Sequence, residues 1–314
     1  MTLPKIVGSM WFNLPEGKTG MRSEDLINKV VLADFWTYSC VNCRRTLPYL
    51  RAWWKKYKDM DFVIIGIHTP EFEFEKDSKN VEQALKDLGV DWPVVLDNEQ
   101  KNWNAFANHY WPAKYLADKT GRIVYEHFGE GAYAETEKKI QELLQVASPP
   151  MPQVAANDHE HGPVCFIPTP ELYCGYERSR LANKDGYRKD QIAHYRPPEE
   201  MPQDSIALAG KFLASKEFVE SAEIGATLFL HFRATEVNLV LHAVGDQAVI
   251  DLSLDNRPLG DRLGKDASNN EVIIKKPTLY SLVKSRELVE GVLAITAKKG
   301  AFRAYAFTFS GCTE

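Results

Sequence analysis

The sequence has no long apolar run and no secretory start. None of its apolar segments approaches the ~20 residues that a helix needs to span a bilayer. Residues 1–6 (MTLPKI) lack the basic start and the apolar core of a signal peptide. Taken as a native start, the sequence predicts a cytoplasmic protein. The alternative is an extracytoplasmic or periplasmic location, if the chain is the soluble part of a longer membrane protein.

An excess of basic charge is also absent. The 314 residues carry 38 Lys and Arg against 43 Asp and Glu, a net charge of -5, and no basic block stands ready to neutralise phosphates. Nucleic acid is therefore not an expected partner. With 44% hydrophobic residues the chain can bury a sizeable core. Its length predicts about two domains.

Cysteines are few, at positions 40, 43, 165, 174 and 312. They are too unevenly spaced for a fold stapled by disulfides, and the two that lie close together indicate a redox or metal motif. In an oxidising compartment Cys165 and Cys174 are candidates to pair with each other, which leaves Cys312 over. Isolated thiols are the equal alternative.

The first half of the chain alternates between two kinds of pattern. Buried-strand patterns lie at residues 30–36, 62–67, 93–97, 114–117 and 123–127, and helical spacing lies at 40–58, 81–88, 103–110 and 135–146. The last two strands flank the turn DKTG and form a predicted hairpin. Residues 1–147 are therefore predicted to form an α/β domain with a mixed sheet.

The second half has a different rhythm. Residues 148–170 are rich in proline and predict a linker. Within it, His159, His161 and Cys165 form an H-x-H-x3-C pattern that could hold a metal, although an ordinary polar linker is the favoured interpretation. Residues 171–314 contain short β-prone runs separated by turns, which predicts an all-β sandwich of jelly-roll type.

Two separated motifs resemble a thioredoxin-fold active site. The first is DFWTYSCVNCRRTLP, residues 34–48, with an Asp six residues before the first Cys, a Trp four before it and a Pro five after the second Cys. The second is Trp111-Pro112 before a strand, where that fold has a cis-proline beside the cysteine pair. The family usually has a second Trp directly before the first Cys, and this chain has Ser39 there.

The likeness extends over nearly the whole chain. Residues 66–74 (GIHTPEFEF) resemble the TlpA/redoxin branch, and in particular the C-terminal region of DipZ-like proteins. Residues 169–176 and 301–309 resemble the second domain of those proteins, whose architecture is similar to carbohydrate-binding modules. Glycan binding does not follow from that likeness. Stacking on sugar rings needs exposed aromatic side chains, and one tyrosine cluster is a candidate: Tyr173, Tyr176, Tyr187 and Tyr195. Core or interface packing is the favoured interpretation of this cluster.

The chemistry of the cysteine pair follows from its place at a helix start. Unpaired backbone N–H groups and the helix dipole favour the thiolate of Cys40, which is the predicted attacking sulfur. Cys43 lies nearly one turn further in and can attack the mixed disulfide formed on Cys40, so it is the predicted resolving cysteine. The redox-active disulfide Cys40–Cys43 is the reactive group, and no cofactor is expected.

Two carboxylates are candidates for proton transfer. Asp34 would lie beneath the cysteine pair in the buried-acid position of the resemblance, where burial raises a carboxyl pKa and allows it to act as acid and base. Glu71 is a second candidate, because the TlpA branch tends to use a glutamate after the next strand. A solvated loop carboxylate is the alternative for Glu71.

Three residues are predicted to shape the substrate side of the site. The resemblance implies that Pro112 exposes backbone edge to an extended substrate and keeps metal from bridging the two sulfurs. Trp36 and Trp111 are expected to form an apolar rim, with ordinary core packing as the alternative. Zinc binding is the rival interpretation of the two cysteines, because a C-x-x-C also supplies half of a tetrahedral zinc site. However, no second C-x-x-C or H-x3-5-H motif follows, and His68 is the only histidine expected nearby.

The sequence thus predicts a thiol-disulfide oxidoreductase that acts on protein or small-molecule disulfides and exchanges electrons with a donor or acceptor partner. The second domain would dock or position the substrate. One alternative is a protein that binds a glycan or a partner, with the thioredoxin half as scaffold. A lesser alternative is a thiol peroxidase, whose activating Arg and Thr/Pro arrangement is not found before Cys40. The pair Val41-Asn42 does not decide between reduction and oxidation.

Overall fold

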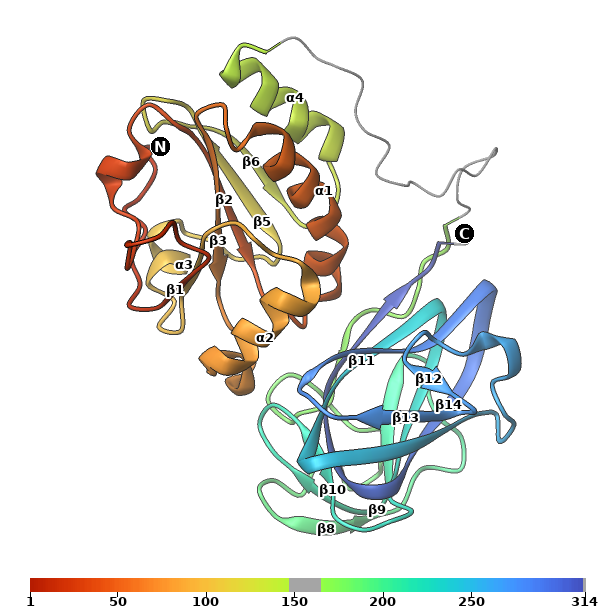
Figure 1. Cartoon of the computed structure of the whole chain (residues 1–314). Helices are drawn as coiled ribbons and strands as arrows, with labels where there is room; N and C mark the ends of the chain where they lie inside the picture. The colour runs from red at the N-terminus through yellow and green to blue at the C-terminus, as the bar shows by residue number, and fades with distance from the viewer. Residues whose placement is uncertain (147–164, 313–314) are drawn as a thin grey trace. The chain divides into compact units, whose positions relative to one another are not determined.

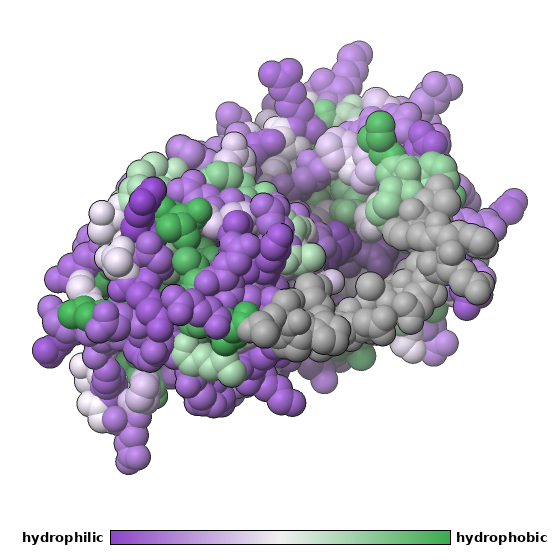
Figure 2. Space-filling view, turned by 90° about the horizontal axis from the view of Figure 1, so that it is seen from above, coloured by the Kyte–Doolittle hydropathy of each residue, from purple (hydrophilic) through white to green (hydrophobic). Residues whose placement is uncertain are grey.

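The computed structural model describes residues 1–146 and 165–312, and the chain divides into two compact units, Met1–Ala156 and Asn157–Glu314 (Figure 1). Most of the predicted linker, together with His159 and His161, lies outside the described residues. The linker and its metal-binding alternative therefore stay predictions. In the view of Figure 2, hydrophilic residues cover most of the surface and apolar residues form small patches.

Unit 1 is an α/β unit built on one six-stranded sheet of order β1-β4-β3-β2-β5-β6. Its strands are β1 (Trp11–Phe12), β2 (Val30–Trp36), β3 (Phe62–His68), β4 (Val94–Leu96), β5 (Ala113–Ala117) and β6 (Ile123–Phe128). Its helices are α1 (Val41–Tyr57), α2 (Ser78–Leu88), α3 (Lys101–Ala105) and α4 (Tyr133–Leu144), with the 3-10 turns η1 (Ser23–Leu26) and η2 (Glu73–Lys76). Strands β2, β3 and β4 are parallel, and β5 and β6 form the antiparallel hairpin, so the predicted mixed sheet is confirmed.

Helices cover both faces of this sheet, which explains the near-continuous apolar runs of β2 and β3. Val30, Leu32 and Trp36 pack in one core with residues of α1, α2 and α4, whereas Val31 and Phe35 pack in the other core. In the described parts of the chain, no helix is long and apolar enough to cross a membrane.

Unit 2 is all-β, as predicted. Its strands are β7 (Leu172–Tyr173), β8 (Ile192–Tyr195), β9 (Ser205–Ala214), β10 (Val219–Ser221), β11 (Thr227–Leu254), β12 (Ala267–Ser268), β13 (Glu271–Ile274) and β14 (Thr278–Ser310), with the 3-10 turn η3 (Gly260–Arg262). They form one sheet rather than two stacked sheets. Strand β9 pairs with both β10 and β11, and both β10 and β11 pair with β14, so the sheet closes into a small barrel with extra strands.

The barrel differs from the predicted sandwich because two strands are long and bent. The predicted runs 227–232, 237–242 and 248–254 are continuous in β11, which pairs with β14 in several registers separated by shifts. Bulges of this kind bend a strand, so a single strand can pair with different partners along its length. A pattern of short apolar runs cannot distinguish such a bent strand from several separate ones.

The cysteines of unit 2 pair differently from the prediction. Cys165 and Cys312 face each other in an antiparallel bridge and form a disulfide, whereas Cys174 is a free and fully buried thiol. The predicted pairing of Cys165 with Cys174 is therefore wrong. The physical reason for this difference is that Cys174 lies in the core of the barrel, where its backbone N–H donates to the carbonyl oxygen of Tyr305.

The tyrosine cluster of unit 2 is engaged internally. Tyr195 is buried, and the Tyr187 hydroxyl donates to the carbonyl oxygen of Cys174 at 2.8 Å. The Arg178 guanidinium lies 3.4 Å from the ring centroid of Tyr173, and the Lys189 ammonium lies 4.9 Å from that of Tyr176. These contacts match the packing interpretation and give no support to carbohydrate stacking on this cluster.

We predict that Gly66→Ala destabilises unit 1. A Cβ at Gly66 would lie 3.0 Å from the Trp36 indole nitrogen and 3.0 Å from a Val94 methyl carbon, which overpacks the core by about 1–3 kcal/mol. Urea unfolding followed by tryptophan fluorescence measures this loss, because all seven tryptophans lie in residues 11–111. Gly20→Ala is the control, since its Cβ would approach nothing closer than 3.4 Å. A Gly66→Ala protein as stable as the wild type would contradict the packing described.

Candidate active site

Cys40 caps the N-terminus of α1. The chain leaves β2 at Trp36, and four residues later the Sγ of Cys40 accepts the backbone N–H of Cys43 at 3.2 Å. Cys40 is partly exposed and Cys43 is fully buried, and both are free thiols. Burial, together with the neighbouring Cys40, raises the pKa of the Cys43 thiol. The pair thus combines one accessible sulfur at a helix start with one enclosed sulfur, as the sequence predicts.

Asp34 lies on the face of β2 that carries the cysteine helix. Side chains alternate along a strand, so Asp34 shares the face of Leu32 and Trp36, whose core also contains Cys43. The Asp34 carboxyl is fully buried, and its Oδ1 has no hydrogen-bond partner among the described residues. Burial raises the pKa of Asp34 to about 7, and the Asp34 charge in turn raises the pKa of Cys43. The carboxyl is therefore buried on the strand face whose core encloses Cys43.

Lys114 is a functional candidate that the sequence reasoning missed. It stands opposite Asp34 in the antiparallel pairing of β2 and β5, and it is fully buried. Burial lowers the pKa of Lys114, whereas the charges of Asp34 and Cys43 raise it. A fully buried lysine is rare unless it is paired with an opposite charge. The lysine inside the apolar strand sequence AKYLA was therefore the sequence signal that could have identified it.

The peptide bond between Trp111 and Pro112 is cis, as the resemblance implies. Ala113 pairs with Phe35, so Pro112 lies at the end of β5 that adjoins the end of β2 and hence the approach to Cys40. Pro112 is itself buried, and its carbonyl oxygen accepts the N–H of Gly129 at 2.8 Å. Trp111 is half-buried, and its indole N–H donates to the carbonyl oxygen of Thr69 at 3.0 Å.

Trp36 is not part of a rim, so that prediction is wrong. Its side chain is 1% exposed and belongs to the core, where it meets the His68 ring edge-on. The physical reason is that β2 is covered on both faces up to its last residue, so a side chain on that strand cannot reach the surface. Trp111, which precedes β5 rather than lying within a strand, is the half-exposed tryptophan of the two.

The buried glutamate of the site is Glu75 rather than Glu71. Glu71 is partly exposed, whereas Glu75 in η2 is fully buried and accepts the Ser39 hydroxyl at 2.5 Å. Burial raises the pKa of Glu75, and the hydroxyls of Ser39 and Thr37 oppose this shift. The sequence places both glutamates after β3, but spacing alone does not show which one the 3-10 turn directs inward.

His68 is buried beside the site and is engaged with other side chains. Its Nε2 lies 3.3 Å from the Thr37 hydroxyl, its ring stacks on Tyr38, and burial lowers its pKa to about 3. Among residues 1–146 and 165–312, no group of three or more His, Cys, Asp and Glu side chains is arranged to hold a metal ion.

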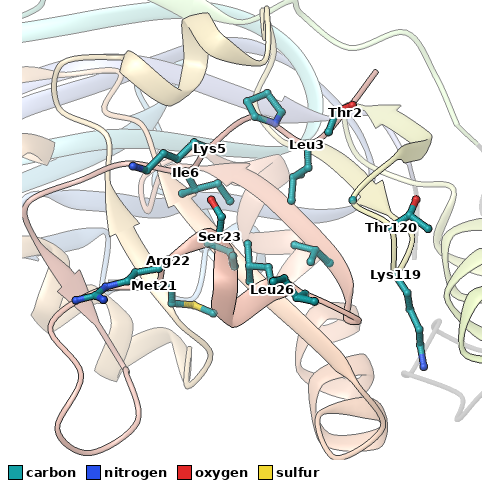
Figure 3. A pocket seen from close by; sticks show the side chains of 15 residues that line it. Thr2, Leu3, Lys5, Ile6, Met21, Arg22, Ser23, Leu26, Lys119 and Thr120 are labelled. Atoms are coloured by element: carbon teal, nitrogen blue, oxygen red, sulfur yellow. The ribbon is translucent and has the colours of Figure 1, made fainter.

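A cavity of about 340 Å³ lies away from this chemistry (Figure 3). Its lining includes Leu3, Ile6 and Leu26, together with Val31 and Ile65. Val31 stands at the start of β2 and faces the second core, whereas the cysteines follow the end of β2 on the first core. The cavity is therefore not part of the cysteine site.

Comparison with known proteins agrees with this arrangement. Residues 7–144 match the Redoxin family, and residues 169–310 match the family described as thioredoxin like C-terminal domain. The DipZ proteins of Mycobacterium tuberculosis and Mycobacterium bovis are each 32% identical to this chain over 311 residues, which is 98% of the chain and 43% of DipZ. The chain thus spans less than half the length of these relatives.

Shorter matches cover unit 1. The thiol-disulfide oxidoreductase YkuV of Bacillus subtilis is 27% identical over 143 residues, which is 45% of this chain and 93% of YkuV. The solved thioredoxin domain of a thiol-disulfide oxidoreductase from Bacteroides vulgatus matches 45% of this chain and 95% of its own at 25% identity, with a TM-score of 0.37. Together, the two family matches show that the chain carries a redoxin domain over residues 7–144, followed by a thioredoxin like C-terminal domain over residues 169–310.

Proposed function

We propose that this chain is a thiol-disulfide oxidoreductase that works through the Cys40/Cys43 pair. The observation that carries the proposal is the asymmetry of the two sulfurs, with Cys40 accessible at the start of α1 and Cys43 enclosed behind it, its N–H 3.2 Å from the Cys40 sulfur. The match of residues 7–144 to the Redoxin family and the similarity of unit 1 to the oxidoreductase YkuV support it. Substrates of this chemistry are disulfide-bearing proteins in general.

In the reducing direction the exchange takes two steps. The Cys40 thiolate attacks one sulfur of the substrate disulfide, and the other substrate sulfur leaves as a thiolate. The Cys43 thiolate then attacks the Cys40 sulfur and releases the second substrate sulfur, which leaves a Cys40–Cys43 disulfide. Two electrons pass to the substrate, and the reverse steps oxidise it. A separate donor or acceptor of electrons must reset the pair.

Asp34 is our proposed proton acceptor for the second step. The buried Cys43 thiol holds its proton tightly and must lose it before it can attack. A carboxyl with a pKa of about 7 can both take up and release a proton near neutral pH. Lys114, opposite Asp34, opposes the rise of that pKa and so keeps the carboxyl within the useful range.

The substrate side of the site is also a proposal. Trp111 is half-exposed at the end of β5 and precedes Pro112, so we assign it to the rim that an extended substrate meets. Pro112 would orient that rim from its buried position. Glu71 keeps no assigned part in proton transfer, because the buried carboxylate of its loop is Glu75.

Unit 2 is proposed to dock or position the substrate. The sandwich resemblance, glycan binding and the thiol peroxidase alternative have no specific observation in their favour, and the engaged tyrosines argue against a sugar-stacking surface on that cluster. The cytoplasmic location, with its extracytoplasmic or periplasmic alternative, stays a prediction.

We predict opposite outcomes for serine variants of the two cysteines. Cys40→Ser abolishes turnover of a disulfide substrate, because the attacking sulfur is gone. Cys43→Ser accumulates a mixed disulfide between Cys40 and substrate, because the resolving sulfur is gone; non-reducing electrophoresis and mass spectrometry detect it. Cys174→Ser is the control, since that thiol is buried in unit 2 and should not affect turnover. Undiminished turnover in Cys40→Ser would exclude the mechanism.

We also predict that Asp34→Asn stabilises unit 1 increasingly as the pH rises. The folded pKa of about 7 exceeds the usual 3.8, so the folded state binds more protons than the unfolded state between these values. Wild-type stability therefore falls with rising pH in that window, and the variant escapes this loss. The advantage of Asp34→Asn should grow by roughly 2–3 kcal/mol between pH 5 and pH 8.5. Urea unfolding followed by tryptophan fluorescence measures it, and a constant difference would show that Asp34 ionises normally.

A further inference from the structure

Glu75 is a fully buried carboxylate for which the exchange chemistry has no assigned use. Its Oε1 accepts the Ser39 hydroxyl at 2.5 Å and lies 3.4 Å from the Ser39 backbone nitrogen. Its Oε2 accepts the backbone N–H groups of Glu71 at 2.7 Å and of Phe72 at 3.0 Å. A single side chain therefore ties the residue before Cys40 to the loop of residues 69–76.

The start of the same loop is tied to the other side of the site. The carbonyl oxygen of Thr69 accepts the Trp111 indole N–H at 3.0 Å, and the Thr69 backbone N–H donates to the carbonyl oxygen of Trp36 at 3.1 Å. Trp111 is the residue that precedes the cis bond to Pro112. The loop thus contacts the approach to the attacking sulfur through Glu75 and the proposed rim through Thr69.

Aromatic contacts hold the middle of the loop in place. Phe72 is buried and stacks with Phe74 at 5.7 Å between ring centroids, and Phe74 meets Tyr38 at 6.1 Å. Tyr38 is the neighbour of Ser39 and stacks in turn on His68. These ring contacts hold the loop by apolar packing, and the Glu75 carboxylate adds a polar connection to Ser39, the residue before Cys40.

Ser39 is the residue at which this chain departs from the resemblance. It is 1% exposed, and its hydroxyl points to Glu75 instead of to the surface. A tryptophan, the usual residue there, has no hydroxyl with which to make this contact. A buried donor or acceptor that loses its partner destabilises its surroundings, so the two residues depend on each other.

We propose that Glu75 is a positioning residue that fixes the Ser39 turn and the loop of residues 69–76, so that Cys40 and the Trp111 rim meet a polypeptide substrate in one geometry. This role rests on the proposed oxidoreductase function. It predicts a selective defect, because a polypeptide must contact both the sulfur and the rim, whereas a small disulfide needs only the sulfur. A role in proton transfer would slow both kinds of substrate.

The test compares two disulfides: insulin as the polypeptide, with dithiothreitol as the reductant, and 5,5′-dithiobis(2-nitrobenzoate) as the small molecule, which the pre-reduced chain reduces after dithiothreitol has been removed. We expect Glu75→Gln to raise the KM for insulin about fivefold to tenfold while kcat and the small-disulfide rate stay within about twofold. Ser39→Ala should shift KM in the same direction by less, and the double variant should be no worse than Glu75→Gln alone. Glu73→Gln is the matched control, because it removes an exposed carboxylate from the same turn.

Equal loss with both disulfides in Glu75→Gln would overturn positioning in favour of a role in the sulfur chemistry. An unchanged KM for insulin in a folded Glu75→Gln protein would also overturn it. If Glu75→Gln fails to fold by tryptophan fluorescence, Ser39→Ala decides alone, and an unchanged KM there contradicts the proposal. A wild-type chain that turns over neither disulfide contradicts the oxidoreductase function itself, and this role with it.

Discussion

The burial of an acid beneath an enclosed thiol is the constraint on which the rest of the site depends. Strand β2 is covered on both faces, so Asp34 on it is desolvated, and the same core encloses Cys43. Water would hold the carboxyl ionised and the thiol accessible, whereas the core raises both pKa values and leaves only Cys40 exposed. The division of labour between the two sulfurs follows from this one difference in solvation. The charge of Lys114 on β5 opposes this rise in the pKa of Asp34.

Packing that begins at strand β2 also arranges the segments around this core. Gly66 on β3 pairs with Asp34 and leaves room for the Trp36 indole, which a Cβ would meet at 3.0 Å. After β3 the chain turns through η2, and Glu75 there returns to the cysteine turn at Ser39. The second unit forms a separate closed barrel whose described ends are joined by the Cys165–Cys312 disulfide.

Much of unit 1 could be predicted from the sequence, because its signals are local. The apolar runs give the strands and the C-x-x-C stands at a helix start, while the cis bond before Pro112 is implied by the resemblance to the thioredoxin fold. The features that the sequence did not predict depend on the direction in which a side chain points or on contacts between residues far apart in the chain. Spacing alone cannot tell Glu71 from Glu75, which lies in the 3-10 turn η2. The rim expected at Trp36 was wrong because coverage of the last residue of β2 is a tertiary property. The Cys165–Cys312 pairing joins residues 147 positions apart, which no local pattern reveals.

The most direct test of the account is the equilibrium of the Cys40/Cys43 couple with reduced and oxidised glutathione. Alkylation of the free thiols followed by mass spectrometry measures it. For the Cys40/Cys43 pair, which is distinct from the Cys165–Cys312 disulfide, the account predicts a two-electron transition in which the thiols of Cys40 and Cys43 disappear together while the buried Cys174 thiol is retained. A potential near about -270 mV would assign a reductant of thioredoxin type, and one near about -120 mV an oxidant of DsbA type. Glutathione bound to Cys40 with Cys43 still a free thiol, or no transition at all, would contradict the central claim.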